Sequence, residues 1–166
     1  MKQIHGIETM FDFNKLQKCS DLIWFDGPLL SHYMTESGDH YLYYWVESDE
    51  EYNRWMLVRT NIIAIKDYVQ RRTTLRKLIS APEDGIVWVA DVDDNLNFHH
   101  TTMLSIAALP EDYLPEENSY YDGECEDEFL TADTQSYSLF VPTKDKPLFS
   151  SIIERMGWKV GRVAVL

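Results

Sequence analysis

Three runs of residues between Asp21 and Thr60 constrain the fold of this chain more than any other feature. Asp21–Thr35, His40–Glu47 and Asn53–Thr60 are dense in β-branched and aromatic residues, and short polar clusters separate them. Such residues favour the half-buried, pleated surface of a sheet, whereas polar clusters favour turns. The stretch therefore predicts three strands of an antiparallel meander joined by two tight turns.

The first run contains a break at Asp26-Gly27-Pro28. Glycine tolerates positive φ and proline lacks an amide donor, so we expect a bulge or a sheet edge there. In the second run the side chains that alternate between the two faces are apolar on both sides, and we expect other parts of the chain to cover both. The two sets are Leu42, Tyr44 and Val46 on one face and Tyr41, Tyr43 and Trp45 on the other.

The period of the apolar residues changes after Asn61. Helical spacing runs from Ile62 to Val69 and resumes from Leu75 to Ile79, with Thr74 available as a cap. A second hairpin follows at Ile86–Leu104. Towards the end we expect a strand, a helix and a strand at Ser136–Val141, Leu148–Trp158 and Lys159–Leu166. These elements predict an α+β fold, in which an antiparallel sheet of five to seven strands (a meander plus a hairpin) packs with two or three helices.

The length of 166 residues fits a single domain, 1–166, with residues 134–166 as a possible C-terminal lobe. Cys19 and Cys125 are far apart and outside any Cys-x-x-Cys spacing, so we expect free thiols. The first ten residues lack the apolar core of a signal peptide, and no run approaches the ~20 apolar residues of a membrane span. The sequence therefore predicts a cytoplasmic protein.

The net charge of −13 is concentrated in one part of the chain. From Leu78 to Thr143 there are 15 acidic residues and no lysine or arginine, whereas the rest has 15 basic and 13 acidic residues. Such a field repels nucleic acid and membrane phosphates and attracts basic partners. The alternative is that these acids only keep a small domain soluble.

A proline-punctuated acidic stretch inside this window is the candidate contact surface. Its like charges disfavour a packed helix and predict an extended loop, in which spaced carboxylates and tyrosines could dock on a basic groove. The competing interpretation is a solvated loop without a partner. The candidate partner-binding residues are Glu111, Asp112, Tyr113, Glu116, Glu117, Tyr120, Tyr121, Asp122, Glu124, Glu126, Asp127 and Glu128.

A second candidate site combines Asp91, Asp93 and Asp94 with His99 or His100. Alternate carboxylates at a strand end can share a hard cation such as Mg²⁺ or Mn²⁺, and this would suit an enzyme that processes nucleotides or phosphodiesters. The pattern is short and also suits a hairpin turn, which we favour. We therefore predict no metal and no cofactor, with the metal site as the alternative.

Other chemistry is weakly supported. The sequence has no Gly-x-Ser-x-Gly, His-Glu-x-x-His or Walker-type motif, which argues against an enzyme with these signatures. A basic cluster on the expected helices could bind phosphate or RNA, but a solvated helix face that pairs with the acidic window is the better interpretation. That cluster comprises Lys66, Arg71, Arg72, Arg76 and Lys77.

Several short motifs between Leu22 and Tyr121 resemble a family of small bacterial domains of unknown function. They are Phe25-Asp-Gly-Pro-Leu-Leu30, Gly38-Asp-His-Tyr-Leu42, Trp45, Asp49-Glu50, Arg54-Trp55, Tyr68, Leu75, Leu78 and Leu109-Pro-Glu-Asp-Tyr-Leu-Pro-Glu-Glu117. The resemblance implies a bacterial or phage source and a cytosolic setting, and it carries over no catalytic residue.

The sequence thus predicts an acidic module that binds a basic protein surface without catalysis, as an immunity, inhibitor or defence protein would. The alternatives are the metal-dependent enzyme and a structural homodimer that uses the aromatic face of the sheet.

Overall fold

A computed structural model describes residues 1, 3–125 and 127–131 of the chain. Within them a seven-stranded antiparallel sheet packs with three helices, so the predicted α+β class is confirmed. The expected elements Ser136–Val141, Leu148–Trp158 and Lys159–Leu166, and the possible lobe 134–166, lie outside the described residues. The strands are β1 (Ile7–Glu8), β2 (Gln17–Trp24), β3 (Pro28–Met34), β4 (His40–Ser48), β5 (Asn53–Thr60), β6 (Ile86–Val92) and β7 (Phe98–Ser105). The helices are α1 (Ile62–Val69), α2 (Leu75–Ser80) and α3 (Glu128–Thr131), with 3₁₀ turns at Phe13–Lys15, Ile106–Ala108 and Glu111–Tyr113.

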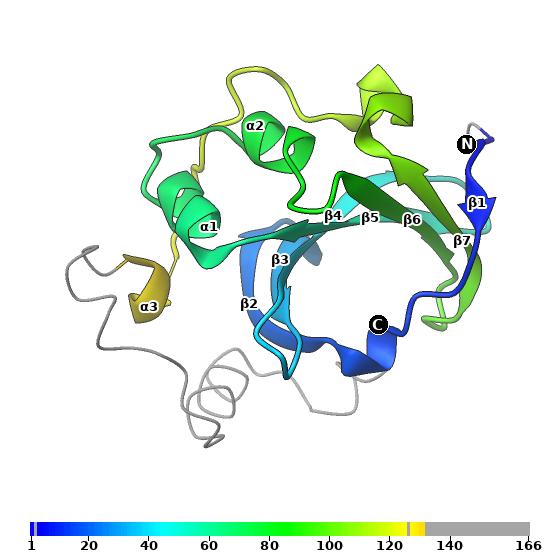
Figure 1. Ribbon diagram of the computed structural model, residues 1–166, viewed down its shortest axis with the longest axis horizontal. Helices are drawn as coiled ribbons and strands as arrows, with labels where there is room; N and C mark the ends of the chain where they lie inside the picture. The colour runs from blue at the N-terminus through cyan, green and yellow to red at the C-terminus, as the bar shows by residue number, and fades with distance from the viewer. Residues whose placement is uncertain (2, 126, 132–166) are drawn as a thin grey trace.

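The sheet is an extended meander with the order β1-β7-β6-β5-β4-β3-β2. Every strand from β2 to β7 pairs with its neighbour in sequence, and β1 adds to the free edge of β7. The sheet curls strongly, with α1 and α2 on its outer side (Figure 1). Large β-branched and aromatic side chains on both faces, together with the right-handed twist of the strands, favour such curvature.

The first strand of the predicted meander is in fact two strands. Asp26 and Gly27, with φ of 52° and 142°, form a hairpin turn that brings Trp24 opposite Pro28. The predicted break lies at this turn, where the pairing of β2 with β3 shows a register shift between Ile23 and Trp24 and β2 forms the edge of the sheet. Residues 9–16, between β1 and β2, form an arm with one 3₁₀ turn, Phe13–Lys15.

Both faces of the sheet are covered, as the alternation predicted. On the outer face Leu42, Met56 and Val58 are fully buried beneath α1, α2 and the segment that follows β7. On the inner face Tyr43 and Leu57 are buried with Phe13 of the N-terminal arm. Tyr41 and Trp45, on the same face as Tyr43, are partly exposed.

The two helices form as the spacing predicted. Asn61 caps α1 by accepting a hydrogen bond from the Ala64 amide (2.9 Å), and Thr74 caps α2 by accepting from Lys77 (3.2 Å). These caps satisfy amide donors that have no partner within a helix. The helices bury Ile65 and Ile79 against the outer face of the sheet. In the part of the chain that the structure describes, no helix has the length and apolar character required to cross a bilayer.

Candidate functional site

The acidic stretch from Glu111 to Glu128, called here the acidic segment, begins with a 3₁₀ turn at Glu111–Tyr113 and is attached to the fold through several of its described residues. The Leu75 amide donates to the Ser119 carbonyl (2.8 Å), and Nη1 of Arg76 donates to the Pro115 carbonyl (2.8 Å). The Arg76 amide donates to the Ser119 hydroxyl (3.1 Å). The first turn of α2 therefore holds the middle of the segment, and its backbone is not a free loop.

Two tyrosines anchor the ends of the segment in the interior. Tyr113 is 2% exposed and Tyr121 is 4% exposed, and the Tyr121 ring packs edge-on against Tyr68 at 5.3 Å between centroids. Burial raises the pKa of both phenols, to about 12 for Tyr113. We predicted partner contacts for these two side chains, but the structure places them in the core, where they hold the loop. Tyr120 alone of the three remains accessible, at 47% exposed.

Like the tyrosines, the carboxylates of the acidic segment include both buried and exposed side chains. Asp127 is buried and accepts from the Phe129 amide (3.0 Å), so it begins α3 and does not lie on an exposed surface. Glu126 lies outside the described residues. The remaining acidic positions are exposed: Glu111, Asp112, Glu116, Glu117, Asp122, Glu124 and Glu128.

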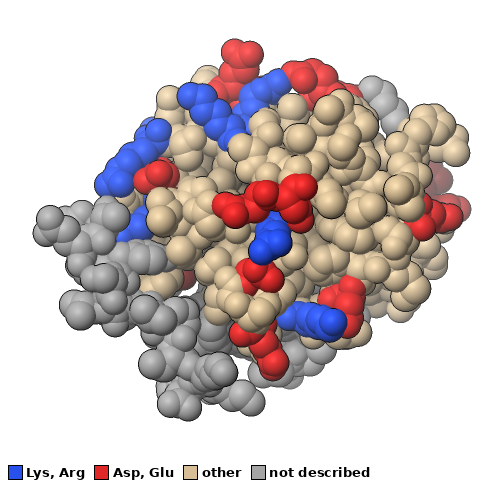
Figure 2. All heavy atoms as spheres, in the orientation of Figure 1, with Lys and Arg blue, Asp and Glu red and all other residues tan. Residues whose placement is uncertain are grey.

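The basic cluster on α1 and α2 neutralises only part of this charge. Arg76 pairs with Glu111, Arg72 pairs with Asp67 (3.2 Å), and Lys66 is buried. Among the described residues no ion pair involves Glu116 or Glu117. On the face seen in Figure 2, acidic groups appear at several places and some lie beside lysine or arginine. The acidic charge is thus not confined to one patch on that face.

The hydroxyl of Tyr113 contacts a buried ion pair between Arg54 and Asp91. Nε and Nη2 of Arg54 donate to the two carboxylate oxygens of Asp91, at 2.7 and 2.8 Å, across the register of β5 and β6. Nη1 of Arg54 donates to the Tyr113 hydroxyl (2.7 Å), which donates to Glu47 (2.7 Å). The hydrogen bond with Asp91 raises the pKa of Arg54, so the guanidinium stays charged although it is buried.

Sequence reasoning did not find this network, although a signal for it exists. On β5, Arg54 shares a face with Met56 and Val58, which an apolar core would cover. A charged side chain at such a position requires a buried partner of opposite sign. On the neighbouring strand β6, Asp91 lies directly opposite Arg54 and on the same face of the sheet, so it can supply that partner.

The structure does not bring together the three carboxylates of the alternative metal site. Asp91 is bound by Arg54 on the outer face. Asp93 shapes the β6–β7 turn, because it accepts from the His99 ring (2.7 Å) and from the amides of Asn95 and Asn97 (both 2.9 Å). The His99 contact first, then these amides, lowers the pKa of Asp93 to about 2. Asp94 is exposed in the same turn, and the described residues contain no group of three or more His, Cys, Asp or Glu side chains placed to hold a metal.

Two histidines on the outer face form a separate buried contact. Nε2 of His32 lies 2.9 Å from Nδ1 of His40, with the rings stacked at 5.1 Å. Burial lowers the pKa of His32 to about 3, and the neighbouring His40 adds to the effect. The pair is accordingly neutral at pH 7 and serves packing between β3 and β4, where the two strands are in register.

Comparison with known proteins gives one match. A model of a family of unknown function, DUF6575, matches residues 21–154, which include the end of β2, strands β3 to β7, helices α1 and α2, and the acidic segment. No curated protein and no solved structure shows significant similarity. A family of unknown function is what the short motifs predicted, and the match extends further along the chain than Tyr121. Because it spans most of the sequence, the chain belongs to the DUF6575 family of unknown function.

Proposed function

We propose that this protein is a binding module that docks on a basic surface of another protein through the acidic segment and carries out no catalysis. The observation that carries the proposal is the attachment of the segment to α2 and to the core. Because Tyr113, Pro115, Ser119 and Tyr121 hold its backbone, the exposed carboxylates between them keep a fixed spacing.

Fixed spacing matters for affinity. A disordered acidic loop would lose conformational entropy on binding, whereas a loop already held in place loses much less. Charged groups on such a loop speed association with a basic surface and select against acidic ones. Tyr120, half exposed beside Ser119, adds a large amphipathic side chain of the kind that anchors interfaces.

An immunity or inhibitor protein of a bacterium or phage would act in this way, by covering the basic groove of an enzyme or of a nucleic-acid-binding protein. Direct binding of nucleic acid is disfavoured by the net charge of −13.

The test is capture of partners from the native host by the chain and by a charge-reversed variant, Glu116→Lys, Glu117→Lys and Glu124→Lys. The partner should be lost from the variant and released from the original chain by rising salt, since screening weakens exposed charge pairs. Interaction that survives both changes would contradict the proposal.

The matched control reverses three exposed acids in three different turns of the sheet, Glu36→Lys, Glu51→Lys and Asp94→Lys. This control has the same net charge as the test variant. It should retain the partner, because the proposal depends on where the carboxylates lie and not on their number.

A further inference from the structure

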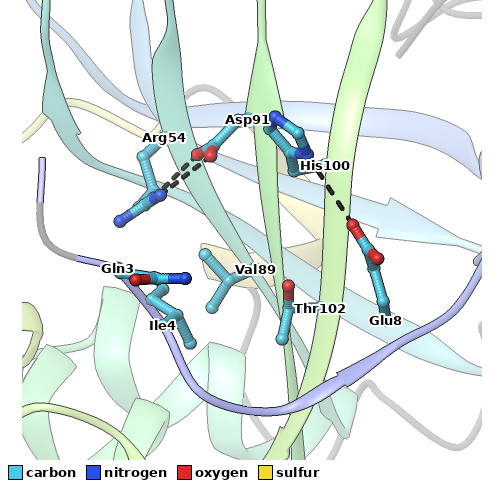
Figure 3. A pocket seen from close by; sticks show the side chains of 8 residues that line it. All are labelled: Gln3, Ile4, Glu8, Arg54, Val89, Asp91, His100 and Thr102. Atoms are coloured by element: carbon cyan, nitrogen blue, oxygen red, sulfur yellow. Dashed lines mark hydrogen bonds and ion pairs between the residues drawn. The ribbon is translucent and has the colours of Figure 1, made fainter.

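A pocket of about 310 Å³ lies between the N-terminal segment and strands β5, β6 and β7 (Figure 3). Its volume is at the lower end of the range for small-ligand sites, about 300–1,000 Å³. We propose that it binds the cationic head and aliphatic stem of an alkylguanidinium or alkylammonium group. The pocket is separate from the exposed acidic segment, so the inference goes beyond the function proposed above. It is lined by Gln3, Ile4, Glu8, Arg54, Val89, Asp91, His100 and Thr102.

The pocket has a buried floor and an open mouth. Val89 and Asp91 on β6 are 3% and 6% exposed, whereas the side chains of Glu8 and His100 are 79% and 58% exposed. In Figure 3, Arg54 and Asp91 lie along one side of the pocket, and Glu8 and His100 approach each other at another. A ligand that enters past Glu8 would therefore move from water towards a partly apolar floor.

The charges of the lining favour a cation. Among the lining residues Glu8 and Asp91 contribute two negative charges and Arg54 one positive charge, so these three groups together are net negative. Glu47 lies outside the lining but only 3.5 Å from Nη1 of Arg54, and it adds a further negative charge. An anion would meet this field unfavourably, whereas a cation gains from it.

The hydrogen-bond groups favour the same class of ligand. The guanidinium of Arg54 directs Nε and Nη2 to Asp91 and Nη1 to Tyr113, so those three nitrogens are engaged by protein acceptors. The oxygens of Glu8, Gln3 and Thr102 are acceptors for the N–H groups of a bound cation.

The apolar part of the lining suits a short aliphatic stem. Ile4 from the N-terminal segment and Val89 from β6 stand between the polar side chains in Figure 3. Ligand sites commonly combine such apolar walls with a few placed polar groups. A cation without a stem, such as ammonium, would leave these walls unused and should bind more weakly.

The N-terminal segment supplies three of the lining residues and is attached to the sheet by few contacts. β1 pairs with β7 through Ile7 and Glu8, and Thr9 donates to the Thr101 carbonyl (3.2 Å). A ligand that contacts both Glu8 and the sheet would link the two. Binding should therefore slow amide hydrogen exchange at Ile7–Thr9, which a non-specific surface contact would not do.

The test is isothermal titration calorimetry of the full chain with propylguanidine and propylamine as probes, and with butyrate as an anion of similar size. We expect saturable binding of both cations and none of butyrate. Glu8→Gln should weaken binding by about twofold, as expected for a largely exposed carboxylate, while the control Glu36→Gln leaves it unchanged. Equal binding of butyrate, or no saturable binding of either cation, would overturn the proposal.

A second arm identifies the natural source of the cation. A blocked tripeptide, acetyl-Gly-Arg-Gly-amide, should bind like propylguanidine if the pocket receives an arginine side chain of a protein. Binding of propylguanidine alone would indicate a free small molecule. The variant with Glu116, Glu117 and Glu124 reversed to lysine should keep pocket binding even where it loses its protein partner, so the two proposals can fail separately.

Discussion

Two buried ion pairs in this sheet show how hydrogen bonding decides the consequence of burying a charge. Arg54 and Asp91 meet across the central strands β5 and β6, and Tyr113 and Glu47 complete their hydrogen bonds. Lys18 and Asp21 meet within the edge strand β2, where Ser31 donates to the carboxylate. The pKa of Arg54 is raised, but the pKa of Lys18 is lowered to about 8, because burial there outweighs the contact with Asp21.

The surroundings explain the difference. A planar guanidinium fits a carboxylate through two parallel hydrogen bonds, whereas a lysine ammonium is more strongly hydrated and loses more on burial. Among the residues that the structure describes, buried side-chain oxygens of Asp21, Tyr33 and Tyr43 have no hydrogen-bond partner. The central pair is therefore a fully hydrogen-bonded network, whereas the edge pair is dominated by the cost of burying its charges.

Breaking the central pair should have the largest effect. Asp91→Ala leaves the buried guanidinium of Arg54 without its main partner and should lower the free energy of unfolding by about 3–5 kcal/mol. Chemical denaturation measures the change, and Asp94→Ala, an exposed residue in the next turn, should change it by less than about 0.5 kcal/mol.

The double variant Arg54→Met, Asp91→Leu sharpens this result. Replacing both charges with apolar side chains should recover most of the lost stability. A single variant as stable as the original chain would show that Arg54 and Asp91 are not a buried, coupled pair.

Removing the hydroxyl that links the central pair to the acidic segment should have the next largest effect. Tyr113→Phe takes one partner from Arg54 and one from Glu47, and it should cost about 2 kcal/mol. Amide hydrogen exchange across residues 113–119 should become faster, because the hydroxyl holds one end of the segment. Tyr120→Phe, at a half-exposed ring, is the control and should change neither quantity.

The lowered pKa of Lys18 predicts that the stability of the fold rises with pH, whereas a lysine with a raised pKa would make it fall. Unfolded Lys18 keeps its proton up to its ordinary pKa of 10.5, whereas folded Lys18 releases it near 8. The folded state binds fewer protons in this interval, so stability should rise by about 1 kcal/mol between about pH 8 and about pH 9.5. Above that interval Tyr33 and Tyr43, whose pKa values are raised by burial, keep their protons in the folded state and should lower stability as the pH rises.

Urea denaturation at several pH values measures this rise. Lys18→Met should remove it, since no titrating group then remains at that position. A rise of the same size in Lys18→Met would assign the effect to another group.

The exposed ion pair between Arg76 and Glu111 should have the smallest effect. The Glu111 side chain is 78% exposed, so water and salt screen the interaction. Glu111→Gln should change the free energy of unfolding by no more than a few tenths of a kcal/mol. A loss as large as that of Tyr113→Phe would mean that the acidic segment is held from its surface and not from its buried tyrosines.

Local patterns in the sequence predicted most of the described fold. Strand alternation, polar turn residues and the cap Thr74 act within a few residues, so they can be read without the tertiary structure. The division of the first run into two strands was not predicted, because β2 starts at Gln17, in a stretch whose apolar spacing is irregular.

The candidate sites were harder to predict because they depend on contacts between distant parts of the chain. Tyr113 and Tyr120 are both tyrosines in one acidic loop, yet one is buried and the other exposed. Arg54 and Tyr113 are 59 positions apart, and Arg54 and Asp91 are 37 positions apart. Composition cannot distinguish these cases.

The sequence by itself determined the antiparallel meander, the two helices and the acidic window without lysine or arginine, because each follows from residue type and short-range spacing. Only the tertiary structure decided which charges are buried in pairs, which tyrosines hold the acidic segment, and where the N-terminal segment closes a pocket over β5, β6 and β7. The physical reason is that burial and hydrogen-bond partners are properties of the packed chain, and strand register alone brings Arg54 opposite Asp91.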